Sequence, residues 1–515
     1  MLVHNFLENS ARRLPDKTAL ICGDRRLTYR QINASADRLA AALIDMGVRK
    51  QDRVLILMDN CVESIISLFG ILKAGGIFVM LTATMKPRKI HFILKDTGAS
   101  VLITHKNKLR VLREVVNKSA ALRQIVWAGT PAKGSLPDTT TSHMFEEITA
   151  GTESPSSFGA NAVIDVDLAT LIYTSGSTGD PKGIMSAHYN MASAVKSITH
   201  YLENVEDDII LNVLPLSFDY GLYQILMAFF MGSTVVLEKS FVYPYKILEI
   251  LVKEHVTGFP IVPTMVAILL QMEEINRFDF TSLRYISNTA AALPVTYIRN
   301  LEQIFPQTKI FSMYGLTECK RVSYLPPDLI HSKPESVGIP IPNEDVFIMD
   351  AGGNELGPGE IGELVVRGSN VMQGYWNAPE ETARTFRPGR YRGETLLYTG
   401  DLFKKDEDGL LYFVSRKDDM IKTKGERVSP KEVENVLCEM AGVLEAAVIG
   451  IPDDIFGQAI KAFIVGDQKI RLTEKLVMKY CTRNLEPFMV PKYIEFRDSF
   501  IKSNSGKIDK KVLTP

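Results

Sequence analysis

Short apolar runs alternate with helical patterns along this chain, and no other feature restricts its possible folds as strongly. Runs of strand length lie at 54–57, 77–81 and 101–103, and helical patterns at 63–72 and 87–96 separate them. Strands that alternate with helices build βαβ units, in which a mainly parallel sheet carries helices on both faces. The rhythm resumes later, with further strand candidates at 209–214, 234–237 and 309–312. The sequence therefore predicts an α/β fold.

From about Val337 the pattern of predicted secondary structure changes. Short strands are then separated by turn signals such as Gly357-Pro358-Gly359, a pattern that predicts a β-rich subdomain. After a charged segment, a helix is expected to open at Ser429-Pro430, because a proline in the first turn gives up no helical hydrogen bond. The remaining residues predict a separate small α+β domain.

Composition excludes several classes of protein. With 515 residues, 46% of them hydrophobic and 23% charged, the chain can bury a large core over two or three domains. Its 59 basic and 60 acidic side chains give a net charge of −1, which provides no field for attracting nucleic acid. The five cysteines are scattered and form no CxxC pair, so we expect neither a disulfide framework nor a zinc site, and a cytoplasmic location.

Two segments bear on membranes. The N-terminus lacks the continuous apolar region of a secretory signal and is typical of an amphipathic helix. The uncharged stretch 220–237 is nearly long enough to span a bilayer. Gln224, Gly232 and Ser233 interrupt it, so a helix, a turn and a buried strand at 234–237 are expected instead of a membrane span.

The segment 173–183, YTSGSTGDPKG, is a candidate phosphate-binding loop. It holds three glycines, four Ser or Thr hydroxyls and Lys182; glycines let backbone amides turn toward an anion, and hydroxyls and lysine bind its oxygens. The spacing matches neither the P-loop nor the dinucleotide-binding motif. A flexible linker is the alternative, but a strand-like run (168–173) precedes the loop and a helix-like segment containing Lys182 follows it.

Four more motifs follow in a fixed order, namely YGLTE at 314–318, YTGD at 398–401, SRKDDMIKTKG at 415–425 and NSGKID at 504–509. Together with the loop they resemble the adenylate-forming superfamily, which includes acyl-CoA synthetases, luciferases and the adenylation domains of peptide synthetases. The resemblance covers essentially the whole chain. It implies a large N-terminal domain (1–417), a small mobile C-terminal domain (418–515) and two half-reactions, in which ATP activates a carboxylate and a pantetheine thiol then takes the acyl group.

The first half-reaction brings two anions together, so it needs positive charge and metal at the phosphates. The resemblance implies that Thr317 contacts the α-phosphate and that Glu318 coordinates Mg²⁺, a role suited to a carboxylate. It also implies that the departing phosphates are held by the loop residues Thr174, Ser175, Gly176, Ser177, Thr178, Gly179 and Lys182.

The same resemblance assigns the nucleoside and the reacting acid. Tyr314 would stack on adenine, Asp401 would accept hydrogen bonds from the ribose hydroxyls, and Arg416 would assist from the domain junction. Lys507 would bridge the substrate carboxylate and the α-phosphate. Outside these motifs, Tyr314 could be an ordinary core residue. Asp401 would more often be a turn residue, and Lys507 a solvated surface lysine.

Because Lys507 must leave before a thiol arrives, the small domain is expected to rotate about a hinge, and the resemblance places this hinge at Asp418. Gly425 would then line the pantetheine tunnel, where the missing side chain permits close approach. No carrier-protein motif fits in the remaining length, so the acceptor would be separate, either free CoA or a phosphopantetheinyl carrier protein.

Phe218-Asp219 stands where the acid pocket is expected. In amino-acid-activating members, an aspartate after an aromatic residue at this place pairs with the substrate ammonium, and an unpaired buried carboxylate would be costly. This favours an amino acid delivered to a carrier protein. A fatty or aromatic acid joined to CoA and an enzyme that stops at the adenylate are the alternatives, and Asp219 is equally able to cap a helix.

Overall fold

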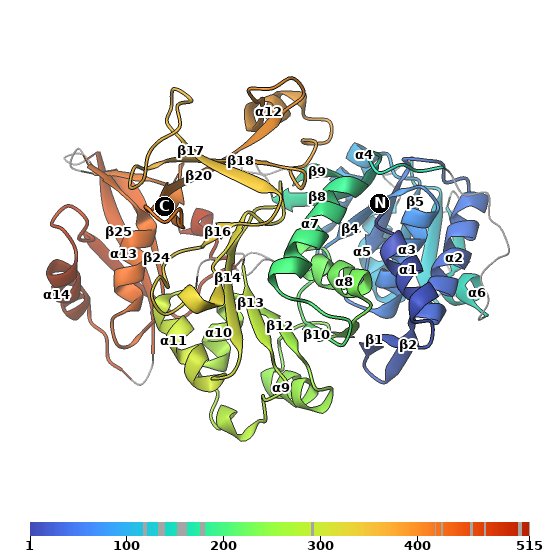
Figure 1. Ribbon diagram of the computed structural model, residues 1–515, viewed down its shortest axis with the longest axis horizontal. Helices are drawn as coiled ribbons and strands as arrows, with labels where there is room; N and C mark the ends of the chain where they lie inside the picture. The colour runs from blue at the N-terminus through green and yellow to red at the C-terminus, as the bar shows by residue number, and fades with distance from the viewer. Residues whose placement is uncertain are drawn as a thin grey trace.

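The structure is a computed structural model that describes residues 1–116, 121–131, 140–151, 162–175, 181–289, 293–417, 419–423, 426–453, 457–467, 470–502 and 507–513. Within these ranges the strands form four sheets. Two large sheets with their helices lie toward the N-terminus, a β-rich layer follows, and a small α+β unit ends the chain (Figure 1). This is the mixed α/β architecture that the sequence predicts.

The seven-stranded sheet is parallel except at its β8–β9 edge. Its strands, in spatial order, are β7 (Thr141–Met144), β6 (Gln124–Ala128), β5 (Val101–His105), β3 (Arg53–Leu57), β4 (Ile77–Leu81), β8 (Leu168–Ser175) and β9 (Pro181–Ala187). The helices between them are α3 (Val62–Lys73), α4 (Pro87–Thr97), α5 (Leu109–Val116) and α6 (Phe145–Thr149). The strands and helices predicted between residues 54 and 103 are thus confirmed.

The nine-stranded sheet is parallel through its centre and antiparallel at both ends. Its order is β16 (Ile339–Pro340), β15 (Ser323–Tyr324), β14 (Lys309–Tyr314), β13 (Tyr285–Asn288), β12 (Gly258–Ile261), β10 (Ile209–Asn212), β11 (Thr234–Leu237), β1 (Thr18–Cys22) and β2 (Arg25–Thr28). Its helices are α1 (Asn5–Arg13), α2 (Tyr29–Asp45), α7 (His188–Tyr201), α8 (Asp219–Met231), α9 (Pro244–Lys253), α10 (Pro263–Leu269) and α11 (Val295–Ile304). One hydrophobic core joins this sheet to one face of the seven-stranded sheet.

The uncharged stretch from residue 220 is a buried helix and strand, as predicted. Helix α8 ends at Gly232, whose φ of +85° suits a residue without a side chain, and β11 begins two residues later. The predicted amphipathic helix at the N-terminus is α1. In the part of the chain that the structure describes, no helix is long and apolar enough to cross a membrane.

The β-rich layer and the C-terminal unit have sheets and cores of their own. The first contains β17 (Glu344–Met349), β18 (Gly362–Gly368), α12 (Pro379–Thr385), β19 (Phe386–Pro388), β20 (Thr395–Lys405) and β21 (Leu411–Arg416). The second contains β22 (Ile421–Thr423), β23 (Glu426–Val428), α13 (Pro430–Cys438), β24 (Val443–Asp453), β25 (Gly457–Gly466), α14 (Glu474–Asn484) and β26 (Tyr493–Arg497). Single 3₁₀ turns lie at Lys106–Lys108, Ile275–Arg277, Pro327–Leu329 and Lys510–Val512.

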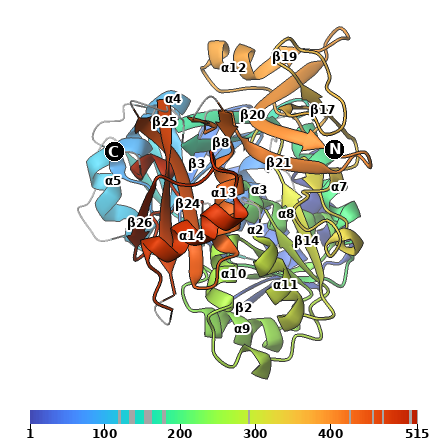
Figure 2. The same cartoon turned by 90° about the vertical axis from the view of Figure 1, so that its left-hand side faces the viewer.

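The C-terminal unit rests beside the end of the nine-stranded sheet that carries β13 and β14, and Figure 2 views the molecule from this side. Helix α13 begins at Pro430, with the Ser429 hydroxyl accepting from the amide of Glu432, as the sequence predicts. All five cysteines are unpaired.

One local prediction is wrong. Lys182 lies on strand β9 and not in a helix-like segment, because Thr174 of β8 pairs with it in an antiparallel ladder. Pro181 and Gly183 beside it are poor helix formers, and the helix begins only at His188.

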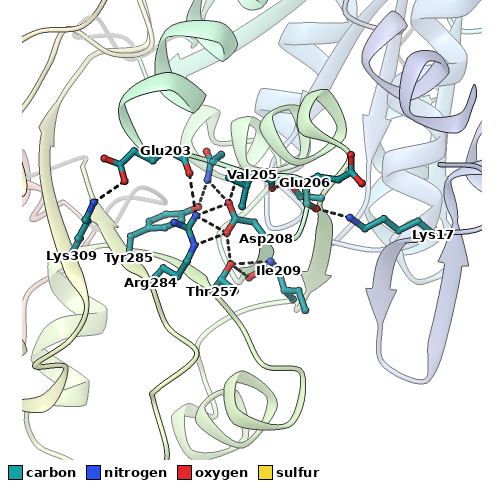
Figure 3. Close-up of polar contacts among 12 residues, drawn as sticks. Lys17, Glu203, Val205, Glu206, Asp208, Ile209, Thr257, Arg284, Tyr285 and Lys309 are labelled. Carbon is teal, nitrogen blue, oxygen red and sulfur yellow. Dashed lines mark hydrogen bonds and ion pairs between the residues drawn. The ribbon is translucent and has the colours of Figure 1, made fainter. Parts of the chain in front are cut away.

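A network around the buried Asp208 carboxylate joins residues that lie directly before strands β10, β12 and β13 of the nine-stranded sheet (Figure 3). The Asp208 side chain has no solvent exposure and accepts hydrogen bonds from Arg284 Nη2 at 2.7 Å and Thr257 Oγ1 at 2.7 Å. The Asn204 side chain and the backbone amide of Val205 donate hydrogen bonds to its other oxygen, Oδ2. Because these partners precede β10, β12 and β13, one carboxylate fixes three strand starts.

Candidate active site

The candidate site is assembled from segments far apart in the sequence. Its residues come from the end of β14 and the loop after it, from β9, from the start of α8, and from β20, β21 and the residues after 506. In open α/β sheets, ligands bind where the carboxyl ends of the parallel strands meet, and β14 ends at Tyr314.

The loop after β14 is a tight turn that presents Thr317 and Glu318. The amides of Cys319 and Lys320 both donate to the Leu316 carbonyl. A side chain on Gly315 would lie 2.3 Å from the Lys320 carbonyl oxygen, so the loop closes only with glycine there. Lys320 itself has a φ of +70°, a strained conformation for a lysine.

Glu318 and Lys182 both lie beside one tyrosine, Tyr375. The Tyr375 hydroxyl donates to Glu318 Oε1 at 2.8 Å, and Lys182 Nζ lies 5.9 Å from the centroid of the Tyr375 ring. Lys182 Nζ also pairs with Glu381 Oε2 of α12 at 2.7 Å. The structure therefore brings the predicted phosphate lysine and the predicted metal ligand to one place.

Tyr314, Asp401 and Arg416 form a second group. Asp401 on β20 is 4% exposed and accepts a hydrogen bond from the Tyr314 hydroxyl at 2.5 Å. Arg416 Nε lies 3.3 Å from its other carboxylate oxygen, because Arg416 faces Asp401 across the β20–β21 ladder. Burial raises the pKa of Asp401, while Arg416, Tyr314 and Lys507 act in the opposite direction.

Lys507 lies where charges from three parts of the chain meet. Its side chain reaches solvent, yet the protein around it lowers the pKa of its ammonium, and Arg416 lowers it further. Asp401, Asp219 and Glu318 oppose this shift. These three carboxylates come from β20, α8 and the loop after β14, so residues from three distant segments influence the pKa of one ammonium.

Asp219 is the first residue of α8 and is 5% exposed. Its Oδ1 accepts from the amide of Tyr220 at 2.9 Å, so the carboxylate takes up one of the free amides of the first helical turn. Phe218 precedes it as the N-cap residue and is half-buried against Tyr220. Both the pocket role and the capping role of Asp219 are compatible with this position.

The structure describes the two ends of the predicted phosphate loop. Thr174 and the backbone of Ser175 lie at the end of β8, next to Lys182. The predicted phosphate, hinge and tunnel residues Gly176, Ser177, Thr178, Gly179, Asp418 and Gly425 lie outside the described residues.

Three side chains at the site are absent from the sequence-based prediction. Tyr375 and Glu381 lie beside Lys182, and no pattern in their segment of the sequence indicates a binding site. Lys320 lies two residues after the YGLTE motif and is 1% exposed. The sequence around it has no hydrophobic periodicity that would predict the burial of a lysine.

The C-terminal unit is joined to helix α11 by a hydrogen bond. The Tyr297 hydroxyl on α11 donates to the Leu444 carbonyl on β24 at 2.9 Å. This contact places the C-terminal unit against α11.

No cluster of three or more His, Cys, Asp or Glu side chains in the described ranges could hold a metal ion by itself. Mg²⁺ is usually bound by one or two carboxylates together with substrate phosphates. A single carboxylate such as Glu318, which accepts a hydrogen bond from the same Tyr375 that lies beside Lys182, fits that mode of binding.

Comparisons with known proteins agree with this geometry. The AMP-binding enzyme family model matches residues 7–376, and the model of the AMP-binding enzyme C-terminal domain matches residues 432–507. The long-chain-fatty-acid–CoA ligase of Bacillus subtilis (strain 168) is 32% identical over 98% of this chain and 93% of its own length. The anthranilate CoA ligase AuaEII in complex with anthranoyl-AMP has a TM-score of 0.89 at 29% identity, covering 100% of this chain and 96% of that chain. Gramicidin S synthase 2 of Brevibacillus brevis is 28% identical over 99% of this chain and 11% of its own length.

The family matches and the CoA-ligase relatives identify an AMP-forming ligase that joins an acid to a thiol. The chain belongs to the AMP-binding enzyme family, within the adenylate-forming superfamily.

Proposed function

We propose that this enzyme activates a carboxylic acid with ATP and transfers the acyl group to the thiol of CoA. In the first step a carboxylate oxygen attacks the α-phosphorus, and the bond to pyrophosphate breaks. In the second step the thiol sulfur attacks the acyl carbon, AMP leaves, and the thiol proton passes to solvent. The geometry that supports this best is at the end of β14, where Tyr314 and Arg416 hold the Asp401 carboxylate and Tyr375 lies beside both Glu318 and Lys182.

Each group has a role that follows from its chemistry. Asp401 accepts hydrogen bonds from the ribose hydroxyls, with Arg416 holding the carboxylate, and Tyr314 offers a flat face to adenine. Thr317 and Lys182 bind phosphate oxygens, together with the loop residues 174–179. The Glu381 carboxylate must give up Lys182 when phosphate binds, since both compete for one ammonium.

Glu318 is the residue that would hold Mg²⁺, oriented by the hydrogen bond from Tyr375. The ion, when bound, neutralises the phosphate charge that builds up as pyrophosphate leaves.

Lys507 bridges the incoming carboxylate and the α-phosphate. Its positive charge follows the negative charge that develops between them, and electrostatic stabilisation of this kind is usually the largest catalytic effect. We propose that domains 1–417 and 418–515 then rotate about Asp418, which withdraws Lys507 and brings Gly425 to the thiol path.

The fatty-acid and anthranilate relatives, both named CoA ligases, support CoA as the acceptor. A second candidate is loading of an amino acid onto a separate carrier protein. It is favoured by one observation, the burial of the Asp219 carboxylate at the start of α8, where a substrate ammonium would find a counter-charge.

The test supplies ATP, Mg²⁺, a panel of fatty, aromatic and amino acids, and either CoA or a phosphopantetheinyl carrier protein. We expect acid-dependent ATP–pyrophosphate exchange without a thiol, and an acyl-CoA detectable by mass spectrometry when CoA is added. An aminoacyl thioester formed only on the carrier protein would establish the second candidate. Exchange without a thioester on either acceptor would mean that the enzyme stops at the adenylate.

Glu318→Gln is expected to slow adenylate formation on the order of 10²-fold, because it removes a charged contact to the transition state. The Mg²⁺ concentration needed for half-maximal exchange should rise as well. Glu355→Gln is a matched control, since Glu355 is an exposed partner of Lys405 in the β-rich layer. Equal rates for the Glu318 variant and the control at low Mg²⁺ would contradict the metal role.

A further inference from the structure

Arg321 is a buried arginine that neither the predicted site residues nor the proposed steps use. It lies between β14 and β15 and is 2% exposed. Its Nη1 donates to the Lys320 carbonyl at 2.8 Å. Its Nε and Nη2 are covered by protein, and neither has a hydrogen-bond partner among the described residues. A buried charge without a counter-charge is costly, so the position of this guanidinium needs an explanation.

Two tyrosines lie beside the guanidinium. Its central carbon is 4.7 Å from the centroid of the Tyr220 ring on α8. The Tyr201 hydroxyl, which also acts on Arg321, donates to Met313 Sδ at 2.9 Å. Aromatic rings attract a cation, but a neutral tyrosine does not balance its charge. In the part of the chain that the structure describes, this arginine therefore has aromatic neighbours and no carboxylate partner.

The two unpartnered nitrogens lie on one edge of the guanidinium, and two other arginines show what this edge binds. Arg284 donates from Nε at 3.0 Å and from Nη2 at 2.7 Å to Oδ1 of Asp208. Arg367 donates from Nε at 3.1 Å and from Nη2 at 2.6 Å to Oδ2 of Asp345. The planar fork of N–H groups matches the geometry of a carboxylate. A carboxylate supplied by a ligand would complete the same arrangement at Arg321.

The guanidinium lies against the wall of the predicted acid pocket. Tyr220, whose ring it faces, directly follows Asp219 at the start of α8. The Tyr220 hydroxyl donates to the Ser287 carbonyl of β13 at 2.6 Å, which holds the ring near the edge of the sheet where ligands bind. The predicted metal and phosphate residues gather around Tyr375 instead. The position of Arg321 therefore suits the acid subsite better than the phosphate site.

We propose that Arg321 is a specificity-determining residue whose Nε and Nη2 bind a second carboxylate at the far end of the acid substrate. The substrate class is then a dicarboxylic acid, of which one carboxylate is adenylated and Arg321 binds the other. Because both nitrogens are closed to solvent, the bound carboxylate displaces a neighbouring side chain and is held away from water, where such hydrogen bonds are strong. This inference rests on the proposed ligase function, and it holds whether or not the acid carries an amine.

The test uses ATP–pyrophosphate exchange to compare each diacid with its monoamide, which has the same size and no second charge. The pairs are succinate with succinamate, glutarate with glutaramate, aspartate with asparagine, and glutamate with glutamine. The readout is the ratio of kcat/KM for the diacid to that for the monoamide. We expect wild-type enzyme to favour the diacid about tenfold or more in the pairs that it uses, since the monoamide leaves the guanidinium unpaired.

Arg321→Met should lower this ratio at least about tenfold. A purely structural loss would slow both members of a pair equally and leave the ratio unchanged. Arg321→Lys keeps the charge without the fork and should retain more of the preference than the methionine variant. The matched control is Arg277→Met, because Arg277 is an exposed arginine that also lies over a tyrosine ring, that of Tyr245, at 5.5 Å; its ratio should equal that of wild type.

A wild-type enzyme that uses monocarboxylic acids and rejects every diacid, or that prefers the monoamides, would overturn the inference while leaving the ligase function intact. A ratio unchanged in Arg321→Met would also overturn it. Free acetate should not accelerate exchange with the monoamides; an acceleration would indicate a separate carboxylate effector and contradict a substrate carboxylate at Arg321. Absence of exchange with every acid, including fatty and aromatic acids, would instead contradict the proposed function.

Discussion

Lys507→Ala is expected to lower adenylate formation by about 10²-fold or more while leaving the second half-reaction largely intact. The lysine stabilises charge only in the first transition state, and removing one such contact typically costs about that much. Adenylate formation is measured by ATP–pyrophosphate exchange. The second step is measured by supplying synthetic acyl-adenylate and CoA and following the thioester.

Lys502→Ala serves as the control for this variant. Lys502 lies five residues earlier and pairs with Glu445 inside the C-terminal unit at 2.8 Å, so its loss tests general damage to this part of the chain. Equal losses in both half-reactions for Lys507→Ala would show that the lysine supports structure and does not act in adenylation.

Asp208→Ala is expected to reduce the free energy of unfolding by about 2–4 kcal/mol. The substitution removes a fully buried carboxylate and the hydrogen bonds that it accepts from Arg284, Thr257 and Asn204. Arg284 is 39% exposed, so water offsets part of the cost of a pair buried on both sides. Urea unfolding followed by circular dichroism gives the value.

Glu203→Ala is the comparison for Asp208, because Glu203 pairs with Lys309 while both side chains are more than half exposed. Exposed pairs of this kind contribute about 0–1 kcal/mol. A loss below about 1 kcal/mol for Asp208→Ala would contradict the view that this network fixes the starts of β10, β12 and β13.

The fold could be predicted wherever local pattern and tertiary packing agree. The apolar runs at 54–57 and 77–81 are strands because they are buried on both sides, and the turn at Gly232 ends α8 because glycine accepts its positive φ. The prediction of a helix-like segment at Lys182 is wrong, since Lys182 lies on strand β9. The short segment 181–187 has no decisive periodicity, and only its pairing with β8, a tertiary contact, makes it a strand.

The site was predictable to the extent that its residues lie in recognisable motifs. Tyr314, Glu318, Asp401 and Lys507 are found in such motifs, and the structure brings their charges together. Their catalytic roles remain predictions. Tyr375 and Lys320 could not be found from the sequence, since one acts through a hydrogen bond from a distant loop and the other is buried only because the loop after β14 folds back on itself.

The most direct test of the central claim is the fate of ATP during turnover with an accepted acid and CoA. Phosphorus NMR identifies the products without any label on the acid. The proposed reaction breaks the bond between the α- and β-phosphates, so AMP and pyrophosphate should appear in equal amounts with the thioester. Formation of ADP and inorganic phosphate would contradict it.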